Sequence, residues 1–330
     1  MEQTDLEVTS MGPAQPAPAV MAASTVQRRW LTRADVWGYA FISPWVIGFL
    51  VFTLVPFVAS LFLSLTNWEV VGDWEFVGLK NFARLLGGGD ALFSRALRNT
   101  GVYVVFHVPG VQIIALALAL LLNQRLRGIA IYRTVFYLPA VTAGVATSYL
   151  WAQMFASNGG LLNTGLALVG IQGPNWLYSM EWSMPALIIM SFWNVGTTML
   201  IYLAALQGVP RHLHEAAMID GAGTWSRFAH VTVPMITPAI FFNIVQGIIG
   251  SFQVFTAAFI ITQGGPANAT LFYSLYLYRT AFERLQLGYA SALAWILFVI
   301  ILGATIIQLA MARLWVYYEG EAPIRAGGAR

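Results

Sequence analysis

Long apolar stretches without charged side chains recur along this chain of 330 residues. A helix needs about 20 mostly apolar residues to cross the hydrocarbon core of a bilayer, because each residue advances it by only about 1.5 Å. Six stretches of sufficient length are present, at approximately residues 37 to 66, 99 to 123, 134 to 157, 184 to 207, 236 to 262 and 289 to 312. The pattern predicts an all-α, polytopic membrane protein with six transmembrane helices.

The composition supports a membrane protein. Hydrophobic residues make up 58% of the chain and charged residues 9%, against about 25% charged residues in soluble domains. The net charge of +3 is too small for a protein that binds nucleic acid. With so few charged residues, the chain is expected to be surrounded by membrane lipid. The absence of cysteine excludes disulfides and thiolate metal sites, and four scattered histidines argue against a histidine-based one. We therefore expect no metal and no cofactor.

The distribution of charge predicts the orientation of the six spans. Six spans place both termini on the same side of the membrane. Eleven of the 17 basic residues fall on that side, and six fall on the other side. Because basic residues collect on the cytoplasmic side, both termini are expected in the cytoplasm. No acidic or basic residue lies within a predicted span, and ion-driven carriers usually keep an intramembrane charge. This distribution argues against a carrier of that kind.

The composition of the termini divides the chain into three parts. Residues 1–36 are predicted to be a disordered cytoplasmic tail, residues 37–312 the six-helix transmembrane domain, and residues 313–330 a cytoplasmic C-terminal tail. Arg28 and Arg29 before an apolar segment also suggest a twin-arginine signal. The apolar segment is about 30 residues long and contains Pro44 and Pro56, which is too long for the apolar region of a signal. A retained first helix is the preferred interpretation.

No pattern of catalytic residues is present, and no catalytic residue is predicted. The run Gly87-Gly88-Gly89 lacks the lysine of a phosphate-binding loop. His107 stands alone beside Pro109 and is interpreted as a hydrogen-bonded or cavity-facing histidine. His212 and His214 are two positions apart, so they do not face each other on a helix. The chain is therefore not expected to be an enzyme.

The polar segment 209–238 has an architecture of its own. Pro210 favours the start of a helix and Gly221 its end about eleven residues later. Thr224 suits the N-cap of a second short helix, and Pro234 with Pro238 are expected to end that helix and start the fifth span. Two short helices on the cytoplasmic face form a docking surface, although this architecture fits an ordered loop equally well.

The residues of this segment resemble a known motif. They read Glu215-Ala216-Ala217, three residues, Gly221, nine residues, Val231-x-Val233-Pro234. The EAA loop of ATP-binding-cassette importer permeases has the pattern E-A-A-x3-G-x9-I-x-L-P, so the two aliphatic positions differ only in being valine. Asp220, Ala222 and Phe228 further resemble the sugar-uptake branch of that family.

The resemblance extends over nearly the whole chain. Short matches occur at residues 76–79, 81–82, 99–100, 137–139, 262–266 and 288–292, in the order and spacing of the sugar permeases. The chain thus resembles a type I importer permease, similar to the first membrane subunit of maltose and glycerol-phosphate importers. The resemblance implies a bacterial cytoplasmic membrane and a heterodimer with a second permease subunit. It also implies two ATPase subunits, which hydrolyse the ATP, and an extracytoplasmic sugar-binding protein.

The resemblance assigns ATPase coupling to the EAA loop. The implied coupling residues are Glu215, Ala216, Ala217, Asp220, Gly221, Phe228 and Pro234. Glu215 would accept a charge-assisted hydrogen bond from an arginine of the ATPase, and the two alanines would let the helix lie close to it. Gly221 would provide a sharp bend, and Asp220 would cap or pair locally.

Two polar stripes are candidate substrate contacts, because sugar sites combine polar groups with aromatic platforms. The fourth span carries Met190, Trp193, Asn194 and Thr197, and the fifth carries Asn243, Gly247, Gly250, Ser251 and Val254. Each stripe has helical spacing, and helix packing is the alternative, above all for the glycines. Spans without arginine or lysine favour a neutral sugar over an anion. Importers of glycerol-phosphate or polyamine, and a membrane-embedded enzyme, remain the alternatives.

Overall fold

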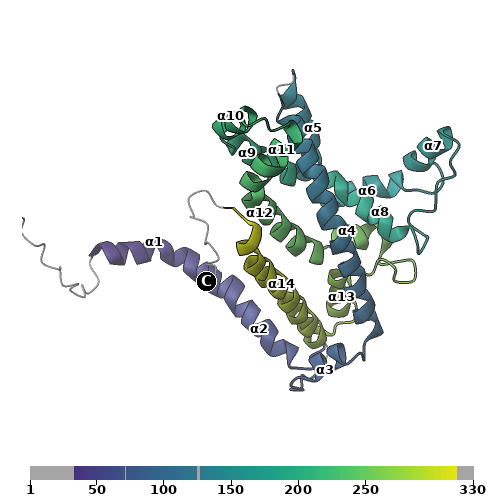
Figure 1. Ribbon diagram of the computed structural model, residues 1–330. Helices are drawn as coiled ribbons and strands as arrows, with labels where there is room; N and C mark the ends of the chain where they lie inside the picture. Colours follow the sequence, from purple (N-terminus) through teal and green to yellow (C-terminus); the bar gives the residue numbers. More distant parts are fainter. Residues whose placement is uncertain (1–32, 71, 125–126, 318–330) are drawn as a thin grey trace, which may run out of the picture. The chain divides into compact units, whose positions relative to one another are not determined.

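The structure is a computed structural model that describes residues 33–70, 72–124 and 127–317 (Figure 1). Within these ranges the chain forms α-helices, short π-helical and 3-10 turns, and one isolated β-bridge between Thr66 and Phe76. The predicted tails fall mostly at residues 1–32 and 318–330, which lie outside the described residues. Contacts divide the chain into two units, Met1–Pro56 and Phe57–Arg330, and the second contains all the sites discussed below.

The first span is a helix with a wide turn before a proline. Helix α1 (Arg33–Phe49) continues through a π-helical turn, Leu50–Leu54, into α2 (Val55–Ser64). The Val55 N–H donates to the Leu50 carbonyl, five residues back. Pro56, which lacks an N–H and crowds the carbonyl four residues back, follows directly. The widened turn lets the helix continue, and the candidate span Trp37–Ser64 agrees with the predicted one.

The second span begins earlier than predicted. After the short helix α3 (Lys80–Leu86), helix α4 runs Ala91–Leu122. Asp90 caps α4, since its Oδ1 accepts hydrogen bonds from the backbone N–H groups of Leu92 (3.0 Å) and Phe93 (2.9 Å). Arg95 and Arg98, which the sequence assigns to the preceding loop, therefore lie on the first turns of α4.

The third and fourth spans are bent pairs, and their prediction as single helices is wrong. Helices α5 (Ile129–Val141) and α6 (Gly144–Met154) meet at 99°. Helix α8 (Ser183–Ser191) with the 3-10 turn Phe192–Asn194 meets α9 (Gly196–Gly208) at 46°. Within the residues that the structure describes, four helices are long and apolar enough to cross a membrane alone, and up to six spans result if each bent pair is one span.

The bend between α5 and α6 has a local cause. Pro139 lies near the end of α5 and removes a backbone donor from its last turn. Three residues later Thr142 is extended, with ψ 138°. Its hydroxyl donates to the Leu138 carbonyl at 3.0 Å, so the side chain satisfies a backbone group that the broken helix leaves without an amide donor.

The fifth span also continues through a proline. Helix α10 (Arg211–Ile219) precedes α11 (Thr224–Arg227), which runs through a π-helical turn, Phe228–Thr232, into α12 (Val233–Phe252). The Val233 N–H donates to the Phe228 carbonyl, as in the turn before Pro56. The prediction that Pro234 and Pro238 separate a short helix from the span is therefore wrong. Helix α12 ends ten residues before the predicted boundary.

The remaining elements follow α6 and α12. Helix α7 (Leu161–Leu168) lies in the loop after α6. A π-helical turn at Ala258–Thr262, helix α13 (Tyr273–Tyr278) and another π-helical turn at Arg279–Glu283 precede α14 (Leu287–Trp315). Helix α14 agrees with the predicted sixth span.

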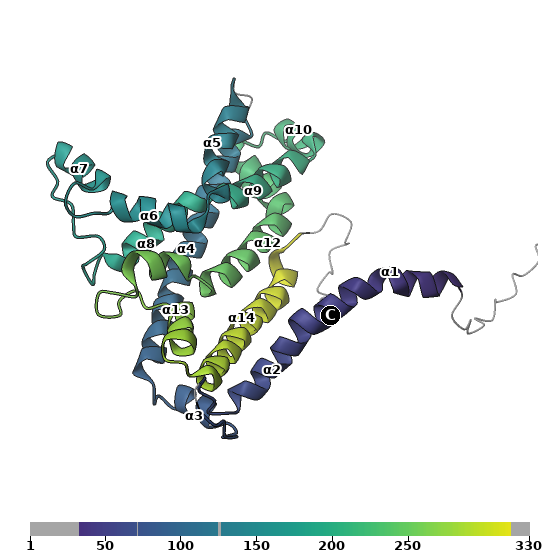
Figure 2. The same ribbon diagram turned by 180° about the vertical axis from the view of Figure 1, so that it is seen from behind.

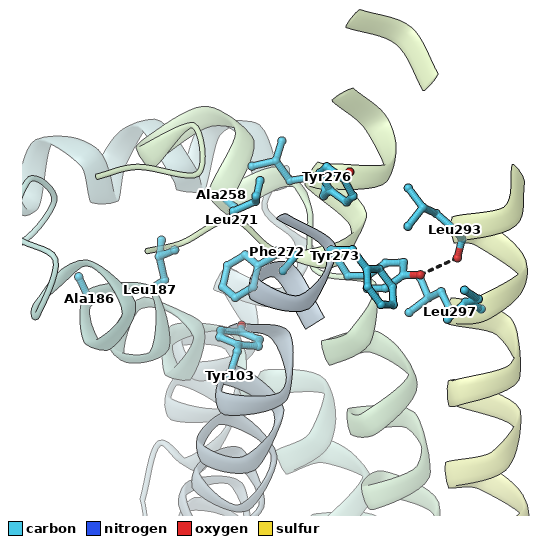
Figure 3. Close-up of a cluster of buried hydrophobic side chains, with 14 of the residues drawn as sticks. Tyr103, Ala186, Leu187, Ala258, Leu271, Phe272, Tyr273, Tyr276, Leu293 and Leu297 are labelled. Atoms are coloured by element: carbon cyan, nitrogen blue, oxygen red, sulfur yellow. Dashed lines mark hydrogen bonds between the residues drawn. The ribbon is translucent and has the colours of Figure 1, made fainter. Parts of the chain in front are cut away.

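Helix α4 is the shared partner of the bundle. It packs against α9 and α12, and α12 packs against α14 (Figures 1 and 2). A buried cluster surrounds α13, where Tyr273 lies among Phe272, Leu293 and Leu297 (Figure 3). The Tyr273 hydroxyl donates to the Leu293 carbonyl at 2.7 Å, so this buried hydroxyl has a hydrogen-bond partner.

Asp90 joins α4 to α13 and α14. Its Oδ2 accepts hydrogen bonds from the hydroxyls of Tyr276 (2.5 Å) and Tyr289 (2.7 Å). The side chain is buried, and burial raises the pKa of a carboxyl. The bonds from both tyrosines and from the two backbone N–H groups outweigh burial, so the pKa of Asp90 lies below its ordinary value of 3.8. The carboxylate is ionised at neutral pH.

Replacing this carboxylate should weaken the fold in a pH-dependent way. Asp90→Asn should lower the free energy of unfolding by about 3 kcal/mol at neutral pH, because an amide cannot accept all four bonds. The contribution of Asp90 is fully present above pH 3.8 and is lost as the pH falls through its lowered pKa. Thermal denaturation of both purified proteins over a range of pH should show that the difference in stability between the wild type and Asp90→Asn becomes smaller in acid. Asp73→Asn, at an exposed carboxyl, is the control. An equal loss of stability in both variants would refute the stabilising role of the Asp90 carboxylate.

Candidate functional site

A cavity of about 260 Å³ lies where the broken helices meet. Three helix interruptions contribute to it: Thr142 at the bend between α5 and α6, Asn194 in the 3-10 turn after α8, and Thr256 beyond the end of α12. Irregular backbone at membrane depth is tolerated where it lines a cavity. The complete lining is Tyr103, His107, Thr142, Gly144, Thr147, Ser148, Leu187, Met190, Ser191, Trp193, Asn194, Thr256 and Ala257.

One wall of the cavity carries a fixed imidazole. The Ser191 hydroxyl donates to the Ile188 carbonyl at 2.5 Å, and Ser191 Oγ lies 2.6 Å from His107 Nδ1. Because the serine proton is used on the carbonyl, the bond network assigns the imidazole proton to Nδ1 and leaves Nε2 as an acceptor. The ring is stacked on Tyr103, with centroids 4.9 Å apart and an interplanar angle of 10°. His107 is thus both hydrogen-bonded and cavity-facing, as its sequence interpretation expects.

An aromatic face forms another wall. Trp193 is 48% exposed and meets Trp151 edge to face, with centroids 5.9 Å apart and an interplanar angle of 79°. Trp151 is buried and fixes this orientation. Among the described residues that line the cavity there is no aspartate, glutamate, lysine or arginine. The cavity therefore offers hydroxyl, amide, imidazole and aromatic groups, which suit an uncharged polar molecule.

The stripe predicted on the fourth span is divided by the helix break. Met190, Trp193 and Asn194 line the cavity, and Thr197 does not. The helical spacing that placed all four on one face does not hold, because the 3-10 turn and the 46° bend lie between Asn194 and Thr197.

The stripe predicted on the fifth span does not line this cavity. The residues concerned are Asn243, Gly247, Gly250, Ser251 and Val254. A Cβ on Gly247 would lie 3.4 Å from Gln112 Nε2 of α4, which fits the packing alternative for this glycine. Val254 follows the end of α12 and so does not continue its helical face.

Several lining residues could not be found from the spacing of the apolar stretches. Thr142, Thr147 and Ser148 lie at or after the bend between α5 and α6, and Ser191 lies beside the 3-10 turn. The available signal was Pro139 with a run of small and hydroxyl residues after it.

The predicted coupling helix ends where the sequence placed its end. Helix α10 follows Pro210, and Asp220 is its C-cap. Gly221 has φ +79°, a conformation that glycine adopts at low cost. The Gly221 N–H donates to the Met218 carbonyl (3.1 Å) and the Ala222 N–H to the Ala217 carbonyl (2.9 Å). This pair of bonds is a Schellman motif. The second helix begins at Thr224 with Gly223 as N-cap, so the predicted capping role of Thr224 is wrong.

The loop presents two carboxylates beside exposed apolar side chains. Glu215, Ala216, Asp220 and Gly221 are exposed, and Ala217 is half-buried. Ile219 is 87% exposed and Trp225 78% exposed. Phe228 and Pro234, both half-buried, lie in the helix that leads from the loop into α12. Exposed apolar groups of this size around a charge indicate a surface for a protein partner.

Known proteins match the chain over most of its length. The model of the family described as "Binding-protein-dependent transport system inner membrane component" matches residues 91–316. The probable ABC transporter permease protein YesP of Bacillus subtilis is 43% identical over 297 residues, 89% of this chain and 96% of the relative. The lactose transport system permease protein LacF of Rhizobium radiobacter is 37% identical, over 88% and 99%.

A solved structure has the same fold. A chain from the crystal structure of a bacterial alginate ABC transporter, in complex with an alginate pentasaccharide-bound periplasmic protein, superposes with a TM-score of 0.75. The alignment covers 86% of this chain and 96% of that chain at 23% identity.

Gly221 should control the order of the coupling helix. Gly221→Ala forces a side chain into the left-handed region at a cost of about 1 kcal/mol, which should raise the amide exchange rates of the last turn of α10 about fivefold. Hydrogen–deuterium exchange measures this. Gly223→Ala is the matched control, because Gly223 has φ −68° and open space around it. The assigned cap would be contradicted if exchange became faster in the control, or if the exchange rates in Gly221→Ala equalled those of the wild type.

Proposed function

The chain belongs to the family of inner membrane components of binding-protein-dependent transport systems, and on that premise we propose that it is the permease subunit of an ATP-driven sugar importer. It forms half of the translocation pathway and partners a second, different permease subunit. The observation that carries the sugar assignment is the cavity between the broken helices, which is lined by hydroxyls and an aromatic face. The names of relatives support it, since LacF is a lactose permease and others transport arabinooligosaccharides and trehalose or maltose.

The cavity fits an uncharged sugar unit. Trp193 offers an apolar platform for a sugar ring, and Asn194, Ser191 and the free Nε2 of His107 offer hydrogen bonds to hydroxyls. We assign Met190, Trp193 and Asn194 to sugar contact. A phosphate or a polyamine would require a group of opposite charge in the wall, and the described lining has none. The glycerol-phosphate and polyamine alternatives are therefore less well supported than a neutral sugar.

The segment from α10 to α12 is the proposed site of coupling to the ATPase. Glu215 is the proposed acceptor for an arginine of one ATPase subunit, and Ala216 and Ala217 leave room for close contact. Ile219 and Trp225 would be buried in that contact. Phe228 and Pro234 join the loop to α12 without a break, so the loop and α12 move together. Two ATPase subunits hydrolyse the ATP for the pair of permeases.

The proposed orientation places the coupling loop and both termini in the cytoplasm. Cytoplasmic ATPase subunits require the loop on that side, and the excess of basic residues agrees with it. The opposite loops then face an extracytoplasmic sugar-binding protein. The membrane is the cytoplasmic membrane of a bacterium.

Loss of the loop carboxylate should uncouple the complex. In liposomes containing the permease pair, ATPase and sugar-binding protein, Glu215→Ala should lower sugar-stimulated ATPase activity at least about tenfold, the size of one lost charge-assisted hydrogen bond. The assay screens glucose, lactose, maltose and maltotriose. Glu181→Ala, which removes an exposed carboxylate from an opposite loop, should leave the activity unchanged. Stimulated activity in Glu215→Ala equal to the wild type would disprove the coupling role.

The cavity assignment has its own test. Asn194→Leu should reduce uptake of the transported sugar about tenfold at limiting concentration, because a hydrogen bond to a hydroxyl is lost and the partner stays desolvated. Thr197→Val lies beyond the bend and outside the cavity, so its uptake should match the wild type. Normal uptake in Asn194→Leu would contradict the cavity assignment, and reduced uptake in both variants would favour the continuous stripe over the cavity.

A further inference from the structure

A second cavity, of about 490 Å³, lies beside α3, at the end of the bundle where α4 and α14 begin (Figures 1 and 2). Ten of its twelve lining residues are hydrophobic, and the other two are Gly88 and Ser94. None of the twelve is charged. We call this cavity the apolar pocket. Its volume lies within the range of about 300 to 1,000 Å³ that small ligands occupy.

The apolar pocket reaches the depth of the lipid acyl chains. Its wall on α14 extends from Trp295 to Ile300, which follow the start of the helix at Leu287 by about 12 and 20 Å. Both residues belong to the sixth span, in a bilayer whose hydrocarbon core is about 30 Å thick. An apolar cavity does not hold water, and an empty one forfeits the dispersion contacts of its walls. The expected occupant is therefore a hydrocarbon chain.

A basic cavity adjoins the apolar pocket. It has a volume of about 340 Å³ and is lined by Arg95 and Arg98 of α4 together with Ala267, Asn268 and neighbouring residues. Ser94 lines both cavities, so the two share a wall. The lining contains no aspartate or glutamate, and neither arginine forms an ion pair with an acidic residue in the described part of the chain. We call this cavity the basic pocket.

The guanidinium of Arg95 is held in a fixed orientation. Arg95 Nη1 donates to the Ala267 carbonyl at 2.8 Å, and Asn99 Nδ2 donates to the next carbonyl, that of Asn268, at 2.9 Å. These bonds fasten the loop before α13 to α4. A guanidinium has five N–H groups, so the bond to Ala267 leaves donors of Arg95 for a ligand. Such a positioned fork suits the oxygens of a phosphate.

The two arginines lie at the level of the lipid headgroups. The charge-free part of α4 begins at Asn99, directly after Arg98. Arg95 and Arg98 are exposed on the turns before it, where long basic side chains reach the membrane surface. A phosphate bound there lies above the hydrocarbon core, and the apolar pocket lies within it.

We propose that the two pockets bind one anionic phospholipid, with an acyl chain in the apolar pocket and the phosphate on Arg95 and Arg98. An acidic protein partner would explain the arginines but leave the apolar pocket empty, whereas a second permease subunit would fill the apolar pocket without using the arginines. A phospholipid uses both. Two guanidinium groups favour a lipid with net negative charge, such as phosphatidylglycerol, over the zwitterionic phosphatidylethanolamine.

Lipid titration of the purified complex tests the site. The chain is assembled with the second permease and the ATPase in detergent, and native mass spectrometry measures the bound phosphatidylglycerol, phosphatidylethanolamine or inorganic phosphate and the Kd of each. Val299→Trp places an indole in the apolar pocket, and Arg98→Gln removes a cation from the basic pocket. Two matched controls lie outside both pockets: Val105→Trp, at an equally exposed valine of α4, and Arg284→Gln, at an exposed arginine.

The wild type should retain one phosphatidylglycerol more tightly than phosphatidylethanolamine. Val299→Trp should lose this lipid, because the space for the acyl chain is filled. Arg98→Gln should raise the Kd for phosphatidylglycerol about tenfold, the size of one charge-assisted hydrogen bond, and leave that for phosphatidylethanolamine less affected. Both controls should bind as the wild type does. Because Arg98 is exposed, Arg98→Gln keeps the test valid even if Val299→Trp lowers the Tm.

Three outcomes would overturn the proposal. In the first, Val299→Trp and Arg98→Gln bind phosphatidylglycerol as tightly as their controls. In the second, inorganic phosphate alone binds as tightly as the lipid and Val299→Trp has no effect, which would indicate a simple anion site. In the third, Arg98→Gln keeps the lipid and weakens association with the sugar-binding protein, which would assign the arginines to a protein contact. Lipid binding is measured without sugar or ATP, so the result is independent of the proposed function.

Discussion

Hydrocarbon offers no hydrogen-bond partners, so every interruption of a spanning helix in this protein has to be satisfied by the protein itself. The structure meets this constraint in two ways. Before Pro56 and Pro234 a π-helical turn moves the hydrogen bond to the carbonyl five residues back, and the helix continues. At Thr142 and around Asn194 the helix does break, and the break lines a cavity. The positions that depart from a regular helix therefore also position the candidate site.

The same constraint governs the polar side chains. Asp90 is buried, yet its carboxylate accepts four hydrogen bonds and ties three helices together at one end of the bundle. The Tyr273 hydroxyl donates to a carbonyl of α14.

The sequence predicts the spans well and their internal breaks poorly. Apolar stretches free of charge are set by the thickness of the bilayer, and the first and sixth spans have nearly the predicted bounds. Bends depend on how one turn is satisfied by its neighbours. Pro139 and Pro234 have the same local signal, although one precedes a bend of 99° and the other lies in a continuous helix.

The candidate sites divide along the same line. The end of α10 at Gly221 was predictable, because a left-handed glycine after a helix is a local property of the chain. The cavity was only partly predictable. Met190, Trp193 and Asn194 were found by helical spacing, which fails at Thr197 because the helix does not continue through it. The sequence indicates His107 as an isolated polar group in an apolar stretch. Its hydrogen bond to Ser191 could not be predicted, because the two residues are 84 positions apart in the chain.

The uninterrupted helix from Thr224 to Phe252 has a mechanical consequence. At 29 residues it is about 43 Å long, and the π-helical turn keeps it a single rod despite two prolines. A rod of that length acts as a lever arm, so a tilt of roughly 5° about one end displaces the other by roughly 4 Å. A hinge at Pro234 would have absorbed that tilt. Because the wide turn keeps the helix continuous there, a small tilt at one end of the helix is carried to its other end.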